Sequence, residues 1–126
     1  MSMIGACLKM SNKRILHVED DDITLMLIQD ALADLGELVQ TSSIEEARSL
    51  LDSKPFDLVL LDFTLPDGSG QALLRHLKTL VEPPAIIVLS GHELVRDMPG
   101  VDKVLTKGRY QMHDLIDYVK EILDKP

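Results

Sequence analysis

The sequence predicts an α/β fold in which helices cover both faces of a single doubly wound, five-stranded parallel sheet. Three observations support this prediction. Short apolar runs alternate with segments whose apolar residues recur at helical spacing. Two of these runs, 58–61 and 85–89, are apolar at every position, which is typical of parallel strands buried on both faces. Polar groups follow four of the runs, at the end where parallel sheets bind ligands.

The first half of the chain contains three predicted strands and two predicted helices. Acidic residues stand at the start of the first helix, where the helix dipole favours them, and Gly36 is expected to end it. Ser43 and Glu46 have the spacing of a capping box for the second helix, which closes before Pro55. The expected elements are strands at 15–18, 38–40 and 58–61, and helices at 22–35 and 43–54.

The second half begins with a helix whose leucines lie on one face. It opens at Ser69 or Gly70 and stops at the Pro83-Pro84 pair. The fourth helix, between 92 and 98, is expected to be shortened to about two turns, because Pro99-Gly100 interrupts the segment. The remaining expected elements are strands at 85–89 and 101–106 and a final helix at 111–123.

Composition limits the core, the partners and the location of the protein. A chain of 126 residues has the length of one compact domain, and 45% hydrophobic but 3% aromatic residues imply an aliphatic core. A net charge of −8 argues against nucleic acid or an anionic membrane as the direct partner. A single cysteine fits a reducing compartment, so a cytoplasmic location is expected. No segment approaches the roughly 18 apolar residues of a membrane span.

The first residues are set apart from the predicted domain. They are mildly apolar, but no basic stretch precedes them and the apolar run is too short for the core of a signal peptide. Residues 1–12 are therefore expected to be a flexible leader or an extension added for expression, and residues 13–126 to form the domain.

Polar side chains follow four of the predicted strands. The acidic run 19–22 follows the first strand, Asp62 ends the third, Ser90 the fourth and Lys107 the fifth. Since the carboxyl ends of parallel strands share one edge, these groups are expected to meet there. Two carboxylates about 4 Å apart repel by roughly 1 kcal/mol in water and roughly 4 kcal/mol at an effective dielectric constant of 20. One lysine cannot balance the cluster, so the crowding predicts a divalent cation.

A hard cation among carboxylates predicts phosphoryl chemistry. Mg²⁺ typically binds one or two carboxylates together with waters and phosphate oxygens. With Mg²⁺ bound, Asp62 can act as a nucleophile on phosphorus and form an aspartyl phosphate. Lys107 and Ser90 would each contact a phosphoryl oxygen. The plainer role of a helix N-cap is assigned to Asp22, and no function is predicted for His17, His76 and His113.

Four segments resemble the motifs of the receiver domain of two-component response regulators. They are 15–21, 57–62 with the following Pro66 and Gly70, 86–91 and 105–107. They occur in the family's order on the corresponding predicted strands, and the resemblance extends from residue 13 to residue 123. It implies a flavodoxin-like sheet of strand order 2-1-3-4-5, which is carried over from the family, and makes 13–126 a receiver domain.

The resemblance also implies a role for each matching residue. Asp62 would be the phosphoacceptor, and Glu19 and Asp20 the acidic pair of the Mg²⁺ site, with Asp20 binding the ion directly and Glu19 through water. The backbone carbonyl of Thr64 would be a further metal ligand beside Asp62. Thr64 and His92 also match positions that tune dephosphorylation in the family.

The implied function is that of a signalling phosphoacceptor. Ser90 and Lys107 would hold the phosphoryl oxygens, and the domain would promote only its own phosphorylation and dephosphorylation instead of acting as an enzyme. A histidine kinase or a histidine phosphotransfer domain would be the partner. The domain would be a monomer or a weak dimer that does not contact nucleic acid directly or insert into a membrane.

Two positions depart from the family's pattern. Val104 stands where an aromatic switch residue is usual, and Gly108 replaces the proline that typically follows the lysine. A cis Lys107–Gly108 bond would cost about 2.5–4 kcal/mol, so a trans bond or a rebuilt loop is expected. Together with the shortened fourth helix, these departures concern the family's signalling face, and phosphate capture is still expected.

Two other functions occur on similar folds but do not fit these residues. A hydrolase of the haloacid dehalogenase type needs a second aspartate where Thr64 stands, and an FMN binder needs a phosphate loop where the acidic run 19–22 would repel the ligand. The alternative that stays open is a receiver-like protein-interaction module with weak or vestigial phosphorylation.

Overall fold

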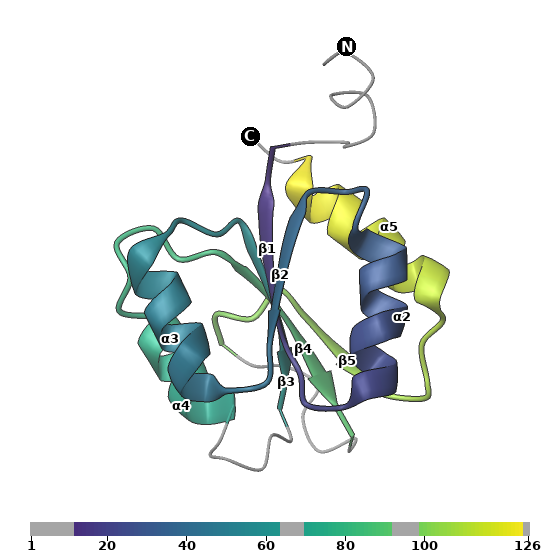
Figure 1. Ribbon diagram of the computed structural model, residues 1–126, viewed down its shortest axis with the longest axis horizontal. Coiled ribbons are helices and arrows are strands. Elements are labelled where there is room, and N and C mark those ends of the chain that lie inside the picture. The colour runs from purple at the N-terminus through teal and green to yellow at the C-terminus, as the bar shows by residue number, and fades with distance from the viewer. Residues whose placement is uncertain (1–11, 64–69, 92–98, 125–126) are drawn as a thin grey trace.

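The computed structural model describes residues 12–63, 70–91 and 99–124, and it confirms the predicted α/β fold. Five parallel strands form one sheet in the order β2-β1-β3-β4-β5, as the resemblance implied. β3 lies at the centre between β1 and β4 (Figure 1). The strands are β1 (Arg14–Val18), β2 (Glu37–Thr41), β3 (Leu58–Asp62), β4 (Ala85–Ser90) and β5 (Lys103–Thr106).

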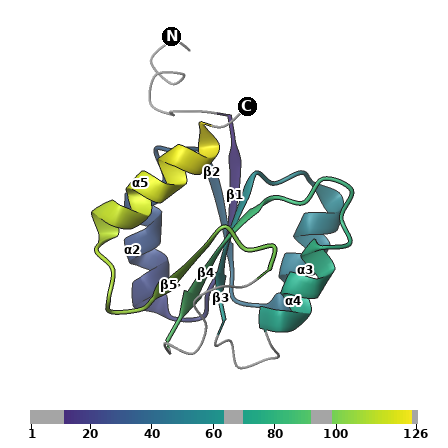
Figure 2. The same ribbon diagram turned by 180° about the vertical axis from the view of Figure 1, so that it is seen from behind.

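The described residues form four helices, which cover the two faces of the sheet in pairs (Figures 1 and 2). α3 (Ile44–Ser53) and α4 (Gly70–Leu77) lie on one face. α2 (Asp22–Leu32) and α5 (Met112–Leu123) lie on the other. Among these residues no helix has both the length and the apolar character needed to cross a membrane.

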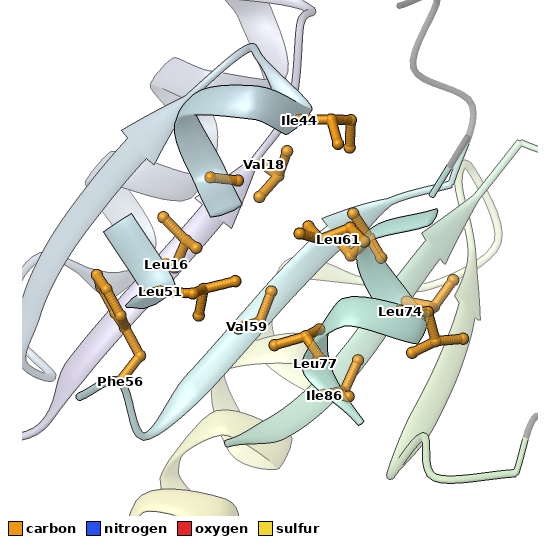
Figure 3. Close-up of a cluster of buried hydrophobic side chains, with 13 residues drawn as sticks. Leu16, Val18, Ile44, Leu51, Phe56, Val59, Leu61, Leu74, Leu77 and Ile86 are labelled. Atoms are coloured by element: carbon orange, nitrogen blue, oxygen red, sulfur yellow. The ribbon is translucent and has the colours of Figure 1, made fainter. Parts of the chain in front are cut away.

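The sheet separates two apolar cores. Along β1, Leu16 and Val18 pack in the core beneath α3 and α4, whereas Ile15 packs in the core beneath α2 and α5. All five residues of β3 are buried, and residues 58–61 alternate between the two cores in the same way. Residues 58–61 of β3 and 85–89 of β4 are therefore all apolar because both faces of these strands are covered. Figure 3 shows the first core, whose buried members are aliphatic apart from Phe56.

Two helices end earlier than their apolar spacing predicted. α2 stops at Leu32, although Leu35 beyond its end is still buried. α4 stops at Leu77, although Leu80 still packs against the first core. The turns after both helices bring these leucines to the apolar cores. The helical spacing of apolar residues in the sequence therefore extends beyond the residues whose backbone is helical.

Two predicted signals at element ends had different outcomes. Ser43 is confirmed as the N-cap of α3, and its hydroxyl oxygen accepts a hydrogen bond of 3.2 Å from the backbone N–H of Glu46. Gly36 does not adopt the left-handed conformation expected of a helix end. A Cβ at this position would lie 2.5 Å from the carbonyl oxygen of Lys13, so glycine is required for the close approach to the residue before β1.

The loop after β5 departs from the family pattern as expected. No peptide bond of the described residues is cis, so the Lys107–Gly108 bond is trans, and Gly108 has a φ of 82° in the left-handed region that favours glycine. Val104 is half-buried against the first core. The predicted short helix at 92–98 and nearly all of the predicted leader lie outside the described residues.

Candidate functional site

The carboxyl ends of the strands bring the predicted site residues to one edge of the sheet. Val18 pairs with Leu61 in register, so Glu19, directly after β1, lies level with Asp62 at the end of β3. Asp62 pairs with Leu89, one residue before Ser90. In Figure 1 this edge lies at the lower end of the sheet. The parallel register is therefore what assembles the site from residues far apart in the sequence.

Three carboxylates gather at this edge. Glu19, Asp20 and Asp62 each offer an oxygen that lies within 4.8 Å of the oxygens of the other two. Glu19 is 0% exposed and Asp62 is 1% exposed, whereas Asp20 is open to solvent. The cluster is thus buried at its base and open on the side of Asp20, and its donors are the carboxylate oxygens that Mg²⁺ prefers.

Lys107 bridges the two buried carboxylates. Its Nζ lies 3.1 Å from Glu19 Oε2 and 3.2 Å from Asp62 Oδ2. The backbone N–H of Lys107 donates a 2.7 Å hydrogen bond to the carbonyl oxygen of Ser90, which anchors the loop after β5 to the end of β4. Burial by itself lowers the pKa of Lys107, but the hydrogen bond to Glu19 and the charge of Asp62 outweigh it and raise that pKa. The lysine is therefore charged, and it balances one of the three carboxylates.

Glu19 is the group most affected by the crowding. Burial and the neighbouring Asp62 raise the pKa of its carboxyl to about 7, against the opposing effect of Lys107. Among the described residues, Glu19 Oε1 has no hydrogen-bond partner. An unpartnered buried carboxylate oxygen beside two further carboxylates fits a cation site, because a bound ion would stabilise the charged form.

His17 is a site neighbour that sequence reasoning missed. It lies on β1 two residues before Glu19, is 0% exposed, and its Nε2 faces Glu19 Oε1 at 3.9 Å. Burial and the nearby charge of Lys107 lower the pKa of His17 to about 4, so the ring is neutral. A histidine within an apolar strand, on the same face as a strand-end carboxylate, was the signal that could have revealed it.

The residues of the acidic run after β1 have different roles, and the N-cap predicted for α2 is wrong. Asp21, and not Asp22, is the N-cap of α2. Its Oδ2 accepts hydrogen bonds from the backbone N–H and the hydroxyl of Thr24 at 2.8 and 2.7 Å, and these bonds lower the pKa of Asp21. Asp22 is the first helical residue and is exposed. The N-cap thus lies one residue earlier than predicted, the helix begins at residue 22 as its predicted range had it, and Asp20 belongs to the carboxylate cluster.

Of the other residues predicted for the site, the structure describes only some. Ser90 is the last residue of β4, is 9% exposed and pairs in register with Thr106 next to Lys107. Thr64 and His92 lie outside the described residues.

The opposite pKa shifts of Glu19 and His17 affect the free energy of unfolding in opposite directions. The pKa of Glu19 rises from 4.5 to about 7, so between these values the folded protein keeps a proton that the unfolded chain loses, and stability falls as pH rises. The pKa of His17 falls from 6.5 to about 4, so between these values the unfolded chain binds the additional proton, and stability rises with pH.

Variants should separate these two effects in metal-free protein. Between pH 4.5 and 6.5 they oppose each other. Glu19→Gln should make stability rise more steeply with pH than in the wild type, and His17→Leu should make it rise less steeply or fall, each by up to about 1.4 kcal/mol per pH unit. Urea unfolding at several pH values in the presence of a chelator measures the slopes. Parallel curves for all three proteins would contradict the assigned shifts.

Known proteins match most of this chain. The family model of the response regulator receiver domain matches residues 15–120. The cell cycle transcriptional regulator CtrA of Caulobacter vibrioides (strain NA1000 / CB15N) is 39% identical over 79 residues, which cover 62% of this chain and 34% of CtrA. The transcriptional regulatory protein TorR of Escherichia coli O157:H7 is 30% identical over 114 residues, which cover 86% of this chain and 49% of TorR. The matches therefore span about a third and about half of these two regulators.

A solved structure agrees with the family match. The BeF3-activated DrrB receiver domain superposes with a TM-score of 0.75 and 28% sequence identity, covering 91% of this chain and 100% of that domain. Strand order, edge carboxylates and the extent of the family match lead to the same conclusion. The chain belongs to the receiver domain family of two-component response regulators.

Proposed function

We propose that this domain accepts a phosphoryl group on Asp62 from a phosphohistidine donor, with Mg²⁺ held by Glu19, Asp20 and Asp62. The carboxylate cluster carries the proposal: three acidic groups lie within 4.8 Å of one another, and two of them are buried. Lys107 offsets one unit of negative charge, so a divalent cation is the simplest way to balance the rest.

The side chains at the edge have separate tasks in the transfer. Bound Mg²⁺ would neutralise charge on the carboxylates and on the phosphoryl oxygens. One Asp62 carboxylate oxygen forms a bond to phosphorus while the bond from phosphorus to the donor imidazole nitrogen breaks. The electron pair of that bond stays on the imidazole, which leaves neutral because its other nitrogen carries a proton. Lys107 then supplies positive charge to one phosphoryl oxygen, and the Ser90 hydroxyl donates a hydrogen bond to another.

The proposal extends to residues and properties beyond this geometry. The backbone carbonyl of Thr64 would be a further metal ligand, and the Thr64 and His92 side chains would set the rate of dephosphorylation. The domain would act in the cytoplasm, as a monomer or weak dimer and as a signalling phosphoacceptor. Its net charge of −8 favours a protein over nucleic acid as its direct partner.

The phosphohistidine donor is proposed to dock on α2. Ile23, Met26 and Leu27 are 64%, 58% and 49% exposed, and their spacing places them on neighbouring positions of one helix surface. Exposed apolar side chains gathered in this way mark a protein interaction surface. α2 begins directly after the acidic cluster. A histidine kinase or phosphotransfer domain in contact with this helix would thus have its histidine within reach of Asp62.

Transfer from two kinds of donor tests this function. Met26→Glu should slow transfer from a phosphorylated histidine phosphotransfer domain by about tenfold or more, as loss of a central apolar contact does in other interfaces. Labelling by acetyl phosphate with Mg²⁺ should be unchanged, since this small donor needs no docking surface. Val81→Glu is the matched control, because Val81 is an apolar residue that is 98% exposed and lies outside α2. Equal losses with both donors, or no loss with the protein donor, would contradict the proposed docking surface.

A further inference from the structure

Two buried polar atoms beneath the site face each other without a hydrogen bond. Among the described residues, His17 Nε2 and Glu19 Oε1 are the buried side-chain nitrogen and oxygen atoms that lack a partner. They are 3.9 Å apart, and both side chains are fully buried. This separation exceeds a hydrogen bond by about 1 Å and is too short for a water molecule to bridge the two atoms in a normal geometry. Such a pair is unfavourable unless a bound ion or another state of the site gives the two atoms partners.

The hydrogen bonds of Gln40 fix the tautomer of His17. The Gln40 side-chain nitrogen lies 2.9 Å from the carbonyl oxygen of Leu25 and 3.0 Å from His17 Nδ1. A carbonyl oxygen can only accept, so the Gln40 atom facing it is the amide nitrogen, whose two protons serve both contacts. His17 Nδ1 is therefore the acceptor, and the neutral ring carries its proton on Nε2, directed at Glu19.

The donors that reach Glu19 approach its other carboxylate oxygen, Oε2. The backbone N–H of Asp21 donates a 3.3 Å hydrogen bond to Oε2, and Lys107 contacts the same oxygen at 3.1 Å and Asp62 at 3.2 Å. In the proposed phosphotransfer Lys107 moves toward a phosphoryl oxygen on Asp62, and Glu19 then loses this contact. Oε2 then keeps the hydrogen bond from Asp21, but Oε1 still has no donor, and the Nε2–H of His17 is the buried donor that faces it.

We propose that His17 is a positioning residue for Glu19, whose Nε2–H bonds Glu19 Oε1 and holds this carboxylate in place for Mg²⁺ when Lys107 turns to the phosphoryl group. Gln40 on β2 is part of the same arrangement, because its side-chain amide fixes the tautomer of His17. The same amide donates a hydrogen bond to the backbone carbonyl oxygen of Leu25 on α2. This inference rests on the proposed function, since it assigns Glu19 to the Mg²⁺ site.

A double-mutant cycle on Mg²⁺ affinity, measured by calorimetry, tests the inference. His17→Leu should weaken Mg²⁺ binding by about 10-fold or more, the usual effect of removing a partner that orients a metal ligand. In a Glu19→Gln background the same change should have little further effect, because His17 acts through Glu19. His17→Gln, which keeps an N–H donor, should recover most of the affinity. His76→Leu is the control, because His76 lies on α4, on the opposite side of the sheet from α2 and α5.

Nuclear magnetic resonance of the imidazole nitrogens gives a readout that a merely structural role would not move. The wild type should show the Nε2–H tautomer, and its Nε2 proton should shift downfield when Mg²⁺ and beryllofluoride are added. Gln40→Leu should give a mixture of tautomers and keeps the measurement available if His17→Leu fails to fold. An Nδ1–H tautomer, an unchanged Nε2 proton, or equal effects of His17→Leu with and without Glu19 would overturn the inference. Wild-type protein that binds no Mg²⁺ would instead overturn the proposed function.

Discussion

Replacing Asp62 with asparagine should abolish phosphorylation of this domain. Asparagine has nearly the same shape, so the buried end of β3 should keep its packing, but an amide is not a nucleophile toward phosphorus. Wild-type protein incubated with acetyl phosphate and Mg²⁺ should gain one phosphoryl group, labile to base and to hydroxylamine as an acyl phosphate is. Intact-mass spectrometry measures both proteins directly.

Asp57→Asn is the matched control for this experiment. Asp57 precedes the opposite end of the same strand, where its Oδ2 accepts a 2.8 Å hydrogen bond from the backbone N–H of Arg14. This substitution removes a carboxylate of the same kind without touching the site, so labelling should stay at the wild-type level. Undiminished labelling of Asp62→Asn would show that another residue is the acceptor.

The second large effect concerns the metal. Asp20→Asn should weaken Mg²⁺ binding by about 10- to 100-fold, because it removes the solvent-facing carboxylate of the three that lie within 4.8 Å. Asp22→Asn should change the affinity little. Asp22 carries the same charge two residues further along, but it is the exposed first residue of α2 and is not one of the clustered carboxylates.

Calorimetric titration of the two variants with Mg²⁺ distinguishes coordination by specific carboxylates from attraction by the total negative charge of the acidic run. Equal losses in Asp20→Asn and Asp22→Asn would mean that the acidic run attracts the ion only by its summed charge. In that case raising the salt concentration should abolish the affinity of the wild type as well, because exposed charges are screened by salt. A defined site should retain most of its binding, since two of its carboxylates are buried.

The fold could be predicted because hydrophobic periodicity and strand position are local signals. The runs 58–61 and 85–89 are apolar at every position because both faces of β3 and β4 are covered, and this burial is recorded in the sequence itself. Helix ends were less predictable. Leu35 continues the helical spacing beyond α2 because a turn also brings it to the core, and Gly36 serves a close backbone approach that only the tertiary structure reveals.

The site was predictable as far as strand ends determine it. Glu19, Asp20, Asp62 and Lys107 meet because the carboxyl ends of parallel strands share one edge. The role of His17 was missed because a histidine in an apolar strand is usually a core residue. Its significance depends on a contact with Gln40 on β2 and a distance to Glu19, and neither can be read from spacing along the chain.

Binding of beryllofluoride, a phosphoryl analogue, tests the phosphoacceptor function most directly against the alternative of an interaction module with vestigial phosphorylation. Amide shifts should be followed while beryllofluoride is added to the wild type with and without Mg²⁺, and to Asp62→Asn with Mg²⁺. We expect saturable changes at Glu19, Ser90 and Lys107 in the wild type with Mg²⁺, and none under the other two conditions. An absence of changes in the wild type with Mg²⁺, or the same changes in Asp62→Asn, would contradict the account.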